Sequence, residues 1–153
     1  MNVAAKLPAA TLSVAPIEDA DIADVVALWQ ACGLTRPWND PQADIALARR
    51  RPNSTVLVGR DADAIVATVM VGHDGHRGWV YYVAVDPDHH GKGHGRTIMN
   101  AAEDWLRQAG VEKLMLLVRS DNTKVQAFYE QLGYDEQKRV IYANGLDGRE
   151  PTP

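Results

Sequence analysis

A glycine-rich turn, placed between an apolar run and an amphipathic segment, constrains this chain more than any other feature. The glycines within residues 91–95 follow the apolar run 79–85 and open a segment with helical spacing. In such a strand–turn–helix unit, the unpaired amides of the first helical turn and the helix dipole favour an anion. Glycines leave those amides accessible, and Lys92 and Arg96 add positive charge. The pattern predicts a loop that holds a pyrophosphate, although glycine clusters also mark ordinary turns.

The spacing of these glycines excludes the two commonest nucleotide-binding loops. A Walker loop needs Ser or Thr directly after Gly-Lys, but Gly93 follows Lys92. The dinucleotide fingerprint G-x-G-x-x-G needs a final glycine where this chain has Arg96 or, two residues later, Ile98. A phosphate compound of another class is therefore expected.

The remaining pattern resembles the acyl-CoA loop of the GNAT acetyltransferase superfamily. The loop HGKGHG, residues 90–95, follows a strand ending Val-Asp-Pro and carries His90 in place of the usual Gln or Arg. A second motif lies downstream, where Asn122 precedes a short helix ending Phe-Tyr-x-x-x-Gly-Tyr. Both motifs stand in the family's order, so the resemblance covers roughly the whole domain. The loops RPWNDP (36–41) and GHDGHRG (72–78) further resemble a bacterial GNAT subgroup that is usually left without an assigned acceptor.

The resemblance implies transfer of an acetyl group from acetyl-CoA to a primary amine, directly within a ternary complex. A non-catalytic acyl-CoA-binding sensor is the alternative. The family pattern also implies that loop amides hold the pyrophosphate and that the preceding strand pairs with the pantetheine arm. The cofactor-binding residues expected on this basis are Val83, Ala84, Val85, His90, Gly91, Lys92, Gly93, His94, Gly95, Arg96 and Asn122.

Tyr129 matches the family's general acid, whose hydroxyl gives a proton to the departing thiolate. A packed aromatic whose hydroxyl finds a local partner is the structural alternative. Asn122 also has two interpretations, as a contact to the cofactor arm or as the N-cap of a helix. The general base stays unassigned, because the run 79–85 contains no carboxylate.

Two loops and one strand supply candidates for the acceptor site. The first loop joins the first two expected helices, a region that lines the acceptor site in the family, and the second is the turn at 73–78. An anionic rim for a cationic amine would form if Asp40 and Asp74 converged. Each candidate has a structural alternative as well, since a tryptophan can cap the core and Asp-Gly-His is a common turn. The candidates are Trp38, Asn39, Asp40, Asp74, His76 and Tyr81, of which the last three are also candidate bases.

The composition of the 153 residues narrows the class of protein. A net charge of −4 argues against general nucleic-acid binding and against an anionic membrane surface. No apolar run approaches a membrane span, and the single cysteine, Cys32, suits a reducing compartment and a packing role. A cytoplasmic enzyme with a small-molecule or protein amine as acceptor is expected. No metal is expected, because glycines separate His90 from His94. Final strands often pair between subunits in this family, so the resemblance leaves room for a homodimer.

The order of patterns predicts one α/β domain over residues 11–142, with a flexible N-terminus at 1–10 and a flexible tail at 143–153. About four helices are expected: one from Ile22 to near Gly33, a short one around 45–48, one from the glycine loop to Ala109, and one at 126–131. Strands are expected at 12–16, 55–59, 64–71 and 79–85, then a fully buried strand at 113–118 and a final pair at 134–138 and 139–142. The mixed sheet would begin as an antiparallel meander and contain one central parallel pair, 79–85 with 113–118. By resemblance, that pair is splayed where the cofactor enters.

Overall fold

The computed structural model describes residues 11–150. The expected flexible N-terminus at 1–10 and the last residues of the expected tail, 151–153, lie outside the described residues. The chain divides after Leu117 into a larger N-terminal unit and a smaller C-terminal unit.

A five-stranded sheet in the order β1-β2-β3-β4-β5 forms the larger unit. The four strands β1 (Ser13–Pro16), β2 (Ser54–Asp61), β3 (Ala64–His73) and β4 (Gly78–Val85) pair antiparallel. β4 then pairs parallel with β5 (Leu114–Met115). The predicted mixed sheet, with its antiparallel meander and parallel pair, is confirmed, although the pair lies at the edge of the described sheet and not in its centre.

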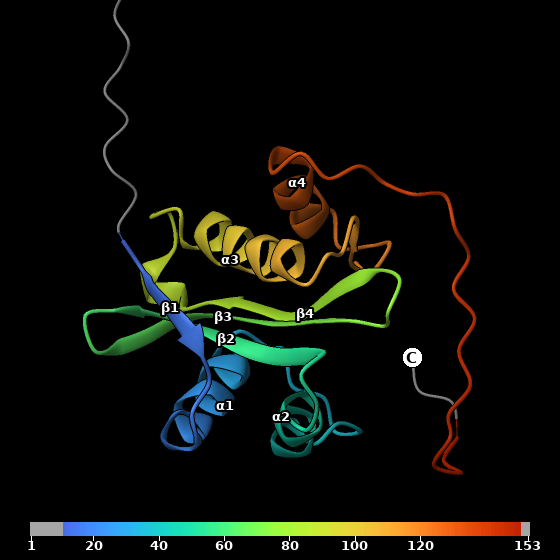
Figure 1. The fold of residues 1–153 in the computed structure, drawn as a ribbon, viewed down its shortest axis with the longest axis horizontal. Helices are drawn as coiled ribbons and strands as arrows, with labels where there is room; N and C mark the ends of the chain where they lie inside the picture. The colour runs from blue at the N-terminus through green and yellow to red at the C-terminus, as the bar shows by residue number, and fades with distance from the viewer. Residues whose placement is uncertain (1–10, 151–153) are drawn as a thin grey trace, which may run out of the picture. The chain divides into compact units, whose positions relative to one another are not determined.

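Helices cover both faces of this sheet (Figure 1). α1 (Ile22–Ala31) and α2 (Pro41–Arg49) lie on one face, and α3 (His94–Gln108) lies on the other. The helix α3 buries Ile98, Ala102 and Leu106 at four-residue spacing, so one apolar stripe faces the sheet. On the opposite face, Trp29 and Ile45 are fully buried against the strands. Among the helices of residues 11–150, none combines the length and the apolar character that crossing a bilayer requires.

The parallel pair opens after two residue pairs, Gly78 with Leu114 and Trp79 with Met115. β4 continues to Val85 beyond the end of this ladder, so the predicted splayed pair is confirmed. The predicted strand at 113–118 is too long and was wrongly expected to be fully buried, because only Leu114 and Met115 pair and both are half-buried. An apolar run indicates a strand, but its pattern carries no information on where a neighbouring strand diverges.

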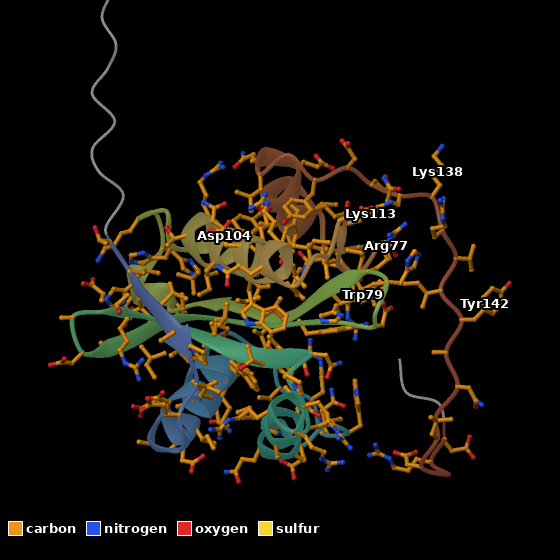
Figure 2. All side chains as sticks on the ribbon, in the orientation of Figure 1. Arg77, Trp79, Asp104, Lys113, Lys138 and Tyr142 are labelled. Atoms are coloured by element: carbon orange, nitrogen blue, oxygen red, sulfur yellow. The ribbon has the colours of Figure 1, made fainter. Side chains whose placement is uncertain are left out.

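The C-terminal unit contains α4 (Thr123–Gln131), and Gly133, two residues after its end, has φ of +92° and stops the helix. The predicted final strand pair is wrong, because residues 134–145 have no regular secondary structure. Val140, Ile141 and Tyr142 are exposed there, and the Tyr142 side chain extends away from its own backbone (Figure 2). A β-prone segment forms a strand only beside a pairing partner, and residues 118–150 contain no strand in the described structure.

Candidate active site

The glycine loop enters α3 through two left-handed residues. Gly91 and Gly93 both have φ of +79°, a region that favours glycine because a Cβ would meet the backbone. Gly93 is the N-cap of α3, and its carbonyl accepts the first helical hydrogen bond from the Thr97 amide at 3.1 Å. The amides of residues 94–96 therefore precede the first helical hydrogen bond and have no acceptor within the helix. This is the geometry that an anion requires.

The charges around this helix start favour the same ligand. The first turns of α1 and α2 contain Asp24 and Asp44, which complement the helix dipole. The first turn of α3 has no acidic residue and contains Arg96 instead. Apart from Gly91 itself and its two chain neighbours, a Cβ built on Gly91 would meet no atom within 4 Å, so there is space beside the loop. The loop fits a phosphate group by its amides, its charge and its free space.

The two predicted histidines of the loop have different environments. His90 is exposed, and its Nε2 lies 3.0 Å from the Val85 carbonyl oxygen. His94 is only 1% exposed, and neither of its ring nitrogens has a hydrogen-bond partner. Burial lowers the pKa of His94, so its ring is neutral. The backbone of His94 can still serve the loop, but its side chain is part of the core.

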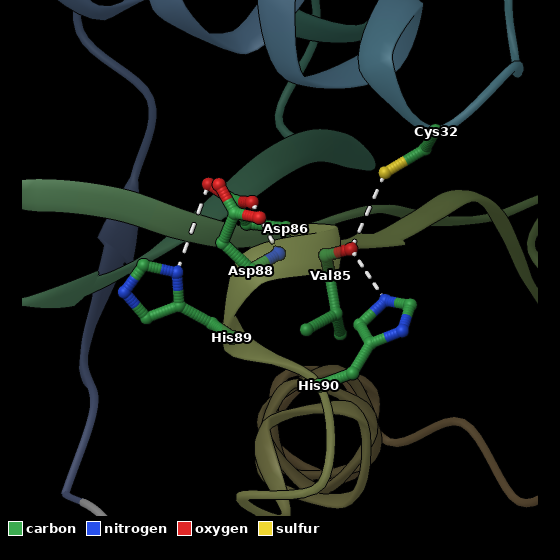
Figure 3. A network of polar contacts seen from close by, with 6 residues as sticks. All are labelled: Cys32, Val85, Asp86, Asp88, His89 and His90. Carbon is green, nitrogen blue, oxygen red and sulfur yellow. Dashed lines mark hydrogen bonds and ion pairs between the residues drawn. The ribbon is translucent and has the colours of Figure 1, made fainter.

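The end of β4 is held by contacts from α1 and from the loop (Figure 3). The Cys32 thiol donates to the Val85 carbonyl at 3.3 Å, and His90 approaches the same oxygen. Burial raises the pKa of the Cys32 thiol, in agreement with a packing role. Asp86 accepts from the Asp88 amide at 2.9 Å and orders the turn that follows. The carbonyl of Val85 is thus occupied, while the ladder between β4 and β5 ends at Trp79, six residues before the end of β4.

The acidic acceptor candidates each bind the backbone of their own loop. Asp40 caps α2 by accepting from the Gln42 and Ala43 amides at 3.0 and 3.1 Å. Asp74 accepts from the His76 and Arg77 amides at 2.9 and 2.8 Å and from Trp79 Nε1 at 3.3 Å. Figure 2 shows Arg77 and Trp79 at this end of the sheet.

These backbone hydrogen bonds, first from Arg77 and then from His76, lower the pKa of Asp74. A carboxylate with a low pKa accepts a proton less readily, so the environment of Asp74 disfavours the role of general base. Tyr81 is 49% exposed on β4, and His76 and Asn39 are exposed while Trp38 is half-buried. Within residues 11–150, no group of three or more potential metal-binding side chains comes together.

The second motif lies in the C-terminal unit. Asn122 is the N-cap of α4, and its Oδ1 accepts from the Val125 amide at 3.3 Å. The Tyr129 ring packs edge-on against Phe128 and Tyr134, with ring centroids 5.0 and 5.9 Å away. Burial raises the pKa of Tyr129 to about 12, so its hydroxyl keeps a proton at neutral pH.

The structure also shows a hydrogen bond between β4 and α2 that the sequence patterns did not indicate. Tyr82 donates its hydroxyl to Asp44 Oδ2 at 2.7 Å, although the two residues are 38 positions apart. Asp44 belongs to the predicted second helix, where an acidic residue near the N-terminus has an ordinary explanation. Only the packing of α2 against the sheet brings it to β4.

Comparisons with known proteins agree with this geometry. The sequence model of the acetyltransferase (GNAT) family matches residues 22–134. An acetyltransferase of Yersinia enterocolitica is 39% identical over 129 residues, which cover 84% of this chain and 92% of that protein. The chain therefore belongs to the GNAT acetyltransferase family. It is an acetyltransferase with the family's fold.

Two solved structures share this fold at low sequence identity. The first is the aminoglycoside acetyltransferase AAC(6')-Iy, in complex with a CoA bisubstrate analogue. Its TM-score is 0.76 at 14% identity, and the match covers 88% of this chain and 98% of that one. The second is the ribosomal-protein-S18-alanine N-acetyltransferase of Escherichia coli. Its TM-score is 0.71 at 24% identity, and the match covers 91% and 88% of the two chains. These two likenesses concern the fold alone.

Proposed function

We propose that this protein transfers an acetyl group from acetyl-CoA to a primary amine, directly and within a ternary complex. One observation carries the proposal: within residues 11–150, β4 has no paired strand on its β5 side after Trp79, and only the short turn Pro87–His89 separates its end from the glycine loop at the N-terminus of α3. An extended ligand arm can pair with such an edge while its phosphates reach the helix amides. Acyl-CoA has this combination of an extended, amide-containing arm and a diphosphate.

Different groups of the chain would bind different parts of acyl-CoA. Backbone groups of Val83, Ala84 and Val85 would pair with the pantetheine arm, except the Val85 carbonyl, which is already held by Cys32 and His90. The loop amides of residues 94–96, with Lys92 and Arg96, would hold the pyrophosphate. The Asn122 side chain caps α4, so any contact to the arm would use its remaining capacity.

In the reaction, the amine nitrogen attacks the thioester carbonyl, the C–N bond forms and the C–S bond breaks. Tyr129 would donate its proton to the departing thiolate, and its raised pKa supports this role because the phenol is protonated over the physiological range. The amine must lose one proton. With no carboxylate in β4 and a low pKa at Asp74, we propose that the amine binds in its neutral form. The proton that its nitrogen loses after the attack then passes through water and restores the Tyr129 phenol.

The acceptor is a small-molecule or protein amine, and Trp38, Asn39, Asp40, Asp74, His76 and Tyr81 remain the proposed residues around it. We place the enzyme in the cytoplasm, with a reduced Cys32. A homodimer formed through the C-terminal segment would cover Val140, Ile141 and Tyr142, whose exposure supports it.

The experiment measures CoA binding by calorimetry and thiol release from acetyl-CoA with a panel of primary amines. Gly91→Ala and Gly110→Ala form a matched pair, because both glycines have φ of +79° and open space around the added Cβ. Each variant should lose about 1 kcal/mol of stability through backbone strain. Only Gly91→Ala, in the loop, should weaken CoA binding, by about tenfold.

Equal CoA affinity in the two glycine variants would contradict the proposed loop. If the protein binds CoA tightly but releases no thiol with any amine, the alternative of an acyl-CoA sensor is the better description. The missing carboxylate in β4 is the observation that favours this second candidate.

A further inference from the structure

β4 contains a residue in an unfavourable backbone conformation. Tyr82 has φ of +50°, in the left-handed region that costs a non-glycine residue about 1–2 kcal/mol. The strand register shifts at the same place, since Ala84 pairs with Thr68 but Tyr81 pairs with Met70. Tyr82 and Val83 therefore oppose the single residue Val69, which defines a β-bulge. Such strain persists only where surrounding contacts hold it.

Three residues from three other elements hold Tyr82. Its ring stacks on Trp29 of α1, with centroids 3.8 Å apart and planes 9° from parallel. Its hydroxyl donates to Asp44 of α2 at 2.7 Å, and its carbonyl accepts from the Thr68 hydroxyl of β3 at 3.1 Å. Trp29 Nε1 in turn donates to Thr68 Oγ1 at 2.9 Å. Both the side chain and the backbone of Tyr82 are thus fixed.

The interior position makes these contacts strong. Trp29 and Thr68 are fully buried, so their hydrogen bonds have no competition from water. Burial, together with the Asp44 carboxylate, raises the pKa of Tyr82, so the hydroxyl remains a donor. The group formed by Trp29, Asp44 and Thr68 is called the Tyr82 clamp below.

We propose that the Tyr82 clamp positions the backbone of Val83, Ala84 and Val85 for the pantetheine arm of acyl-CoA. A bulge changes the direction of the strand that follows it, and the residues that follow Tyr82 form the proposed pairing edge. This inference rests on the proposed function. It assigns Asp44 as a positioning residue that acts through Tyr82.

A charged role for Asp44, as an acid–base group or a partner of the acceptor ammonium, predicts different behaviour. Asp44→Asn keeps an oxygen that accepts from the Tyr82 hydroxyl but removes the charge. Asp44→Ala removes both. A clamp therefore tolerates Asn and is weakened by Ala, whereas a charged role is lost in both variants.

The experiment compares two probes by calorimetry, CoA and adenosine 3′-phosphate 5′-diphosphate, which lacks the pantetheine arm. In Asp44→Ala and Tyr82→Phe, CoA affinity should fall about tenfold, or about 1.4 kcal/mol, while the diphosphate binds within about twofold of wild type. Asp44→Asn should restore most of the CoA affinity. Leu57→Ala, a buried change in β2, controls for general loss of stability and should leave both affinities unchanged.

Unchanged CoA affinity in Asp44→Ala and Tyr82→Phe would overturn the inference, and so would an Asp44→Asn variant as weak as Asp44→Ala. Failure of the wild type to bind CoA would instead refute the proposed function. The clamp is tested independently by amide hydrogen exchange, because Asp44→Ala should accelerate exchange in residues 83–85. Unaltered exchange there would overturn the clamp.

Discussion

Replacing Tyr129 with phenylalanine tests the proposed chemistry most directly. The change removes one hydroxyl and keeps the ring, which packs edge-on against Phe128 and Tyr134. A positioned general acid contributes about 10²–10⁴-fold to rate, so kcat should fall at least about 100-fold. The KM for acetyl-CoA should change by less than about twofold, since the proton transfer occurs only in the transition state. Tyr134→Phe removes a hydroxyl from the neighbouring ring and is the matched control.

The pH dependence gives a second measurement on the same residue. Burial raises the pKa of Tyr129 from an ordinary value near 10 to about 12, so the acid stays protonated well above neutral pH. Thiol release by the wild type should therefore show no loss of activity from tyrosine ionisation up to about pH 10. Turnover by Tyr129→Phe at the wild-type rate across this range would refute the acid assignment. A wild-type decline near pH 10 that is absent from the variant would refute the effect of burial.

Two further predictions concern the buried His94 and the carboxylates of the proposed acceptor site. Burial lowers the pKa of His94 below its ordinary 6.5, so the unfolded chain binds a proton more readily and the free energy of unfolding falls as pH drops below that value. His94→Leu should reduce this loss in thermal unfolding measured from about pH 8 to about pH 5, and identical pH profiles would contradict it. Asp40→Asn and Asp74→Asn remove a negative charge but keep an oxygen that accepts from the loop amides. Each variant should therefore raise the KM for a cationic amine about two- to fivefold. An unchanged KM would count against the anionic rim formed by Asp40 and Asp74.

Local patterns in the sequence predicted the parts of the fold that depend on neighbours in the chain. Short apolar runs bounded by turns indicated β2, β3 and β4, and the four-residue spacing of Ile98, Ala102 and Leu106 indicated the buried stripe of α3. The glycine-rich turn between a strand and a helix was indicated by the same kind of argument, and the structure shows that Gly91 and Gly93 are left-handed. The family resemblance also came from short motifs.

Features that depend on contacts between distant segments could not be predicted in this way. The strand expected at 113–118 was too long and the final strand pair was wrong, because strand formation requires a partner in register. His94 was expected among the cofactor-binding residues, and only the structure shows that its side chain is buried without a hydrogen-bond partner, which leaves its backbone for that role. Asp74 was a candidate general base, and only the structure shows that backbone hydrogen bonds within its turn lower the pKa of its carboxyl group.

The sequence by itself therefore determined the family, the meander and the glycine-rich turn that opens α3, because each is specified by residues close together in the chain. Only the tertiary structure decided the conformation of Tyr82 and the carboxylate that faces it. The bonds from Trp29 to Thr68 and from Tyr82 to Asp44 join residues 39 and 38 positions apart. No local pattern records such pairs, since they form only when α1 and α2 pack onto the sheet. The path of β4 beside the proposed cofactor site depends on that packing.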